Sequence, residues 1–77
     1  MCNIRLLDIP IGNRAVVEKL LNKGSIRRRL LDIGLTPGTV VEKVMTNPGN
    51  NLIAYMIRGA LIAIRNDDAK DILVREL

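Results

Sequence analysis

The residues of this sequence that most resemble a ligand set are three closely spaced aspartates, Asp67, Asp68 and Asp71. Carboxylate oxygens are suitable ligands for hard cations such as Mg²⁺ and Ca²⁺. Their spacing does not match an EF-hand loop, and acidic residues in the first turn of a helix are also explained by the helix dipole. We therefore predict no metal site, although weak cation binding by these aspartates stays open.

Catalytic groups are scarce. The chain has no His and a single Cys, Cys2, and no Ser is placed with a base, so a Ser or Cys nucleophile activated by an imidazole is excluded. Iron(II) sites usually include imidazole or thiolate ligands, and this inventory contradicts an iron carrier. The six glycines are dispersed singly and form no phosphate-binding loop. We predict a protein that is not an enzyme and that needs no cofactor.

The composition indicates one small globular domain. The chain has 77 residues, of which 48% are hydrophobic and 26% charged, and Tyr55 is its single aromatic residue. The formal net charge is +4, with basic residues concentrated at Lys19, Lys23 and 27–29. Such a patch suits nucleic acid, an anionic membrane or an acidic protein surface. Proteins that read single strands stack bases on aromatic side chains, so one tyrosine makes nucleic acid the weaker partner.

We recognise no targeting signal in this sequence. The start of the sequence lacks the charged region and long apolar stretch of a signal peptide, and Cys2 alone cannot form an intrachain disulfide. No apolar stretch approaches the ~20 residues that a membrane-spanning helix requires. We therefore expect a cytoplasmic domain that does not cross a membrane.

A short helix is predicted from Ile26 to about Ile33. Ser25 is a suitable N-cap, and Ile26, Leu30 and Ile33 fall on one face at i, i+4 and i+7. This start places residues 27–29, all arginine, at the positive end of the helix dipole, where cations are unfavourable. An external partner would explain the arginines, and an ordinary solvated basic face is the equally weighted alternative.

The end of this helix is also legible. Gly34 can adopt a left-handed conformation at C′, and Leu35 would then contact Leu30 in a Schellman ending. Pro37 and Gly38 fit the two central positions of a type II turn. A strand follows this turn.

The remaining pattern is mainly β. Gly59 separates two strands and predicts a hairpin, and Asn66 or Asp67 could cap a helical turn that runs through Lys70. Residues 4–11 predict an irregular leader that packs its apolar side chains onto the domain. Short strands joined by Gly and Pro turns usually close into a small barrel, because closure removes sheet edges. The strands that we expect cover residues 15–21, 39–46, 53–58, 61–65 and 72–74.

Two ordered blocks of the sequence resemble the ferrous iron transport protein A (FeoA) family. The first block is 28–39, with its arginines, paired leucines, aspartate, Gly-Leu and Pro-Gly. The second is 57–65, with Arg-Gly and an apolar strand that ends in Arg; Asp68, Ala69, Ile72 and Val74 follow it. The resemblance covers essentially the whole chain and implies one domain over residues 1–77.

The resemblance also implies a fold and a function. The family fold is an SH3-like β-barrel with a helix inserted after the first strand, so we expect about five strands, one helix and one helical turn. The implied function is that of a small cytoplasmic accessory protein of bacterial ferrous iron uptake, which acts on the membrane permease and its GTPase domain. Metal-dependent repressors share the fold but need a helix-turn-helix for which this chain has no room. The loop 47–51 is small and polar, unlike the larger or aromatic loop of many relatives.

The leading hypothesis is therefore a non-catalytic interaction module. The helix and the following turn would present Arg27, Arg28, Arg29, Leu35 and Pro37 to a partner. The alternative is a small basic barrel that binds nucleic acid through phosphates. Weak self-association is also open, and the sequence does not indicate whether the partner is stimulated or inhibited. The expected turn glycines are Gly34, Gly38 and Gly59.

Overall fold

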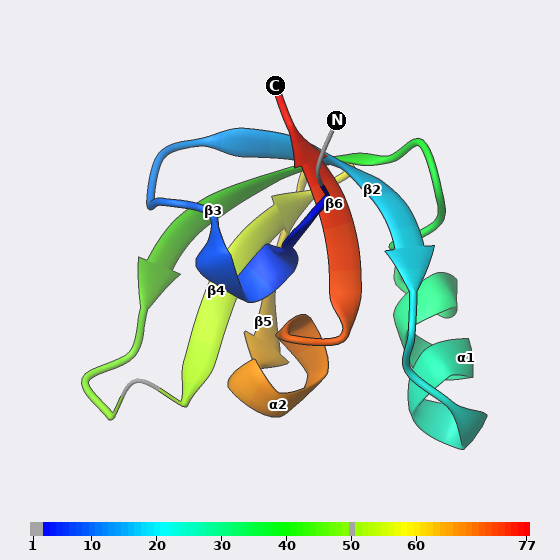
Figure 1. The fold of residues 1–77 in the computed structure, drawn as a ribbon. Helices are drawn as coiled ribbons and strands as arrows, with labels where there is room; N and C mark the ends of the chain where they lie inside the picture. The colour runs from blue at the N-terminus through cyan, green and yellow to red at the C-terminus, as the bar shows by residue number, and fades with distance from the viewer. Residues whose placement is uncertain (1–2, 50) are drawn as a thin grey trace.

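The computed structural model describes residues 3–49 and 51–77 and shows a small, mainly β domain (Figure 1). Six antiparallel strands form one sheet in the order β1-β6-β2-β3-β4-β5. The elements, in chain order, are β1 (Ile4–Arg5), the 3-10 helix η1 (Leu6–Asp8), β2 (Arg14–Leu20), α1 (Gly24–Asp32), β3 (Val40–Thr46), β4 (Leu52–Ile57), β5 (Ala60–Arg65), α2 (Asn66–Ala69) and β6 (Ile72–Glu76).

The sheet curls around one apolar core, as expected for an SH3-like barrel (Figure 1). Alternate residues of the strands point inward, so Ile53, Tyr55 and Ile57 of β4 are buried while Met56 between them is exposed. The Tyr55 hydroxyl donates a hydrogen bond of 3.0 Å to the carbonyl oxygen of Leu6, which ties η1 to the core. Aliphatic side chains fill the rest of the interior.

The five expected strands are present as β2–β6, and β1 is a sixth, so α1 follows the second strand and not the first. The leader packs apolar side chains onto the domain as predicted, but its irregular structure was predicted wrongly. Residues 4–11 are not irregular throughout, because Ile4 and Arg5 pair with Val74 and Leu73 of β6, and η1 follows at once. A two-residue strand shows no readable alternation in the sequence, since its pairing depends on a strand almost at the other end of the chain. Leu6 and Ile9 complete the core there.

The sheet keeps two edges. In the residues that the structure describes, β1 pairs only with β6, and β5 pairs only with β4. The barrel is therefore not closed by hydrogen bonds, contrary to the expectation that closure removes the edges. Helix α2 contacts both β5 and η1, which follows β1, so it lies between the two edges.

Both predicted helix starts were wrong. Helix α1 begins at Gly24, so Ser25 lies inside the helix, and Lys23 occupies the N-cap position with no side-chain hydrogen bond. Ile26 is 46% exposed and does not belong to the buried face, which Leu30 provides. Helix α2 likewise has Arg65 at its N-cap, with Asn66 already inside the helix. Within the described residues, no helix has the length and apolar character needed to span a membrane.

Candidate partner-binding surface

The end of α1 has the predicted Schellman geometry. The Leu35 amide donates to the Leu30 carbonyl at 3.0 Å, and the Gly34 amide donates to the Leu31 carbonyl at 3.1 Å. Gly34 has φ +111°, which an L-residue rarely adopts. This ending turns the Leu35 side chain into the core, where its exposed fraction is 0%. Leu35 therefore cannot present its side chain to a partner, and its predicted place in the binding surface has to be corrected.

The Pro37–Gly38 turn also matches its prediction. The Thr39 amide donates to the Thr36 carbonyl at 3.0 Å, and Gly38 has φ +94°, as a type II turn requires. The Gly38 amide bonds to the Val17 carbonyl at 2.8 Å, so the turn is fixed against β2. Pro37 is exposed and remains available to a partner.

Arg58 joins this region to the β4–β5 hairpin. Arg58 and Gly59 have φ values of +50° and +83°, which is the pattern of a type I′ turn. The Arg58 guanidinium donates to the hydroxyl oxygens of Thr36 and Thr39, each at 3.3 Å. Its aliphatic stem lies against Gly34, where an added Cβ would be 3.0 Å from Arg58 Cδ. The alternating pattern placed Arg58 in a strand, which was wrong, because β4 ends at Ile57 and Arg58 lies in the turn. The sequence could not predict its contacts, because they join segments that are far apart in the chain.

The three arginines of α1 do not form one patch. Arg27 and Arg28 are exposed on one side of the helix, beside Leu31 and Asp32, while Arg29 lies on the other side with Ile26 and Leu30. The earlier start of α1 also moves them away from its positive end, and Arg29 falls in the last turn, where a cation is favourable. The predicted conflict with the helix dipole therefore does not hold for the arginines, whereas Asp32, the last residue of α1, does lie at its negative end.

A groove separates α1 from strand β5. It has a volume of about 110 Å³ and is lined on one side by Ile26, Arg29 and Leu30, and on the other mainly by Ala63, Ile64 and Arg65. The apolar residues at its floor, Leu30 and Ile64, are only 5% and 3% exposed. The groove therefore has a mixed lining, in which apolar side chains stand beside the charged Arg29, Arg65 and Asp68.

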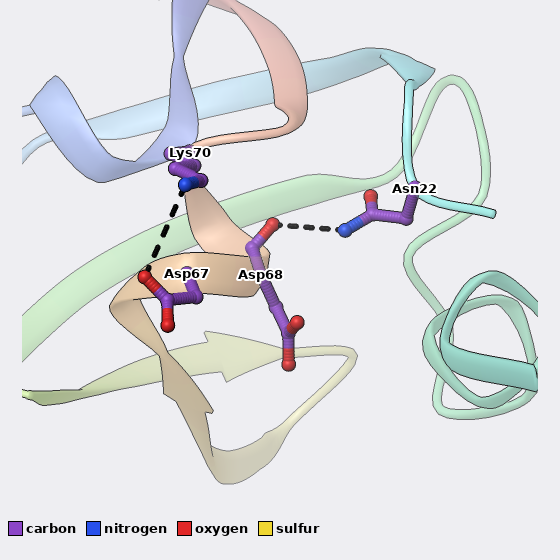
Figure 2. A network of polar contacts seen from close by, with 4 residues as sticks. All are labelled: Asn22, Asp67, Asp68 and Lys70. Atoms are coloured by element: carbon purple, nitrogen blue, oxygen red, sulfur yellow. Dashed lines mark hydrogen bonds and ion pairs between the residues drawn. The ribbon is translucent and has the colours of Figure 1, made fainter.

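The aspartates do not gather into a metal site. Asp67 forms an ion pair of 4.0 Å with Lys70, and Asp68 receives a hydrogen bond of 3.1 Å from the buried Asn22 through its backbone carbonyl (Figure 2). Over residues 3–49 and 51–77, no three His, Cys, Asp or Glu side chains are placed so that they could hold a metal ion. Cys2 lies outside the described residues.

Tyr55 is unsuited to binding nucleic acid bases. It is the single aromatic residue of the sequence, and its exposed fraction is 0%. Burial, assisted by the negative charge of Asp8, raises the pKa of the Tyr55 hydroxyl well above its ordinary value. The ring is thus a neutral core element, and no aromatic side chain is left at the surface for stacking.

The sequence comparison decides the family. The sequence model of the FeoA domain matches residues 4–76, which is nearly the whole chain. This chain belongs to the FeoA domain family. The resemblance noted from the two sequence blocks is confirmed, as is the mainly β, SH3-like fold that it implied.

Relatives of known structure support this FeoA domain assignment. The FeoA protein from Chlorobium tepidum is 30% identical, with a TM-score of 0.91 over 96% of this chain and 70% of that protein. FeoA from Stenotrophomonas maltophilia, described as an SH3 domain protein and solved with zinc, is 29% identical, with a TM-score of 0.79 over 92% of this chain and 88% of that one.

A curated relative is a much longer protein. This FeoA domain is 28% identical over 71 residues to a Porphyromonas gingivalis fusion of Fe(2+) transport protein A with the Fe(2+) transporter FeoB. The match covers 92% of this chain and spans 8% of the length of the fusion protein. In that relative, a FeoA segment and the transporter are parts of one polypeptide.

Proposed function

We propose that this FeoA domain is a cytoplasmic accessory module of ferrous iron uptake that binds the cytosolic GTPase region of a ferrous iron permease. The observation that carries this proposal is the Porphyromonas gingivalis fusion, in which a similar segment is covalently joined to FeoB. Fusion raises the effective concentration of two parts that act together, and separate chains must reach the same contact by affinity. The proposed module needs no catalytic group.

The surface around α1 supports a protein partner. Arg27 and Arg28 are exposed there, and Pro37 lies exposed on the rigid turn that follows the helix. Arginine is enriched at protein interfaces, because its fork of donors can bind carboxylates in pairs. Since the domain has a formal charge of +4, we expect the complementary face of the permease to be acidic.

The test is a direct titration of the two proteins. The purified chain should bind the isolated GTPase region of the permease encoded in the same genome, as measured by calorimetry at low ionic strength. A double-stranded oligonucleotide of arbitrary sequence serves as the comparison. Binding to the oligonucleotide with a steep salt dependence, and none to the GTPase region, would replace this proposal with phosphate binding.

A further inference from the structure

Strand β5 carries unpaired backbone groups along its outer edge. The two-residue turn at 58–59 makes Ile57 and Ala60 the first hydrogen-bonded pair of the hairpin. Antiparallel pairs alternate in type, so Leu61 and Ala63 fall in pairs that are not hydrogen-bonded to β4. Their N–H and C=O groups therefore point away from β4.

Nothing else in the described chain occupies these groups. Over residues 3–49 and 51–77, none of the backbone hydrogen bonds between elements involves Leu61 or Ala63. Both side chains are exposed, and Leu61 is 54% exposed although it is apolar. An edge of this kind is a template for one more strand.

The groove beside α1 lies along this same edge. Ala63 and Ile64 of β5 point to opposite faces of the sheet, and both line the groove, together with Leu52 of β4. Ile26 and Leu30 of α1 form the opposite wall. A helix and an open strand edge that both border a groove can receive an extended peptide.

The charged side chains that line the groove indicate which kind of segment could bind there. Arg29 and Arg65 line it, with Asp68 as the opposing acidic residue. In the described residues, neither arginine forms an ion pair within 4.0 Å. Acidic side chains on an incoming segment would therefore complement two free cations, and an apolar side chain would fit the space of about 110 Å³ between Ile26 and Ala63.

We propose that the α1–β5 groove binds an extended segment with alternating apolar and acidic residues, which adds a strand to β5. Backbone hydrogen bonds to Leu61 and Ala63 would supply the affinity, while the apolar side chains and the two arginines that line the groove would select the sequence. This inference rests on the proposed function and deepens it, because it assigns the extended segment to the proposed protein partner.

The test uses a defined peptide and the full chain. An acetylated, amidated peptide of alternating glutamate and valine is titrated into the ¹⁵N-labelled protein and followed by NMR. We expect shift changes confined to Ile26, Arg29, Leu61, Ala63 and Arg65, with slower exchange of the Leu61 and Ala63 amides. The same peptide with an N-methyl group at every peptide bond has no N–H on either edge, cannot pair as a strand and should not bind.

A matched pair of variants isolates the backbone contact. Ala63→Pro removes the outward N–H but no bond to β4, because Pro is tolerated on an edge strand when its nitrogen faces away from the sheet. Peptide affinity should fall about tenfold or more, since a buried partner loses its donor, while Ala63→Ser should stay within about twofold. If Ala63→Pro does not fold, the N-methylated peptide on the wild-type protein gives the same decision.

Each other outcome overturns the strand addition. Shifts on another face, equal binding of the N-methylated peptide, or no shifts at millimolar peptide would each do so. Protection of Leu61 and Ala63 without peptide, together with a doubled molecular mass, would assign the edge to a second copy instead. The peptide titration contains no permease and therefore tests the strand addition separately from the proposed function. If the Ala63→Pro variant binds the permease as tightly as the wild type, the strand addition is refuted and the proposed function is retained.

Discussion

The Arg58 side chain lies directly against Gly34, so that a Cβ at residue 34 would sit 3.0 Å from Arg58 Cδ and 3.2 Å from its Nε. This contact brings the β4–β5 hairpin against the end of α1. Gly34 thus meets two demands at once, a positive φ and a close approach by another part of the chain. The two demands can be separated by experiment.

Gly34→Ala should destabilise the domain more than Gly38→Ala. Both glycines have positive φ, +111° and +94°, and a left-handed L-residue costs about 1–2 kcal/mol. A Cβ at Gly38 meets nothing within 4 Å, so that variant measures the backbone cost alone. Thermal melts followed by circular dichroism should show the larger loss for Gly34→Ala, at about 4–8 °C per kcal/mol. Equal losses would mean that Arg58 moves aside at no cost.

The hydrogen bonds from Arg58 should couple it to Thr39. Arg58→Asn keeps a residue suited to the type I′ turn, and Thr39→Val removes the hydroxyl that lies 3.3 Å from the guanidinium. Denaturant unfolding of the single and double variants should give a coupling of about 0.5–1 kcal/mol, small because Arg58 is exposed. Arg58→Asn combined with the distant Glu18→Gln is the control, and these two changes should add.

Tyr55→Phe should lower the free energy of unfolding by about 1–2 kcal/mol at neutral pH, because it leaves the buried carbonyl of Leu6 without its hydroxyl partner. The raised pKa of Tyr55 also predicts a pH effect. Above about pH 10 the unfolded chain releases this proton while the folded chain retains it, so wild-type stability falls as pH rises further. Tyr55→Phe should lack this component. Parallel alkaline unfolding curves for the two proteins would contradict it.

The α1 arginines should matter for partner binding and little for folding. Changing Arg27, Arg28 and Arg29 to Gln should weaken binding to the permease GTPase region, and the wild-type affinity should fall with added salt. The control changes Arg5, Arg14 and Lys19 to Gln, which removes the same charge from exposed positions on β1 and β2. If calorimetry gives equal affinities for both variants, net charge alone explains the effect. Equal affinity for the α1 variant and the wild type would place the partner surface elsewhere.

The protein should carry no stoichiometric iron after dialysis. The chain has no His, and the described residues bring no three potential ligands together. Elemental analysis of the dialysed protein checks this, with melting temperatures measured before and after chelation as a second readout. One iron retained per chain, or a large fall in melting temperature on chelation, would favour a carrier over an accessory module.

The sequence by itself determined the features that depend on neighbouring residues. The Schellman ending at Gly34, the type II turn at Pro37–Gly38 and the hairpin at Gly59 each rest on hydrogen bonds and dihedral angles within a few residues. Alternation within each longer strand likewise depends on that strand alone. These signals predicted the mainly β fold, and the family blocks predicted its SH3-like class, although not the sixth strand that places α1 after the second strand.

The tertiary structure decided which side chains are available to a partner. Leu35 is buried because α1 ends against the core, and Ile26 is exposed because the helix starts at Gly24. The open edge of β5 depends on which strands pair across the whole chain. Burial and strand pairing of this kind depend on contacts between segments that are far apart in the chain, and a local sequence pattern carries no information about those contacts.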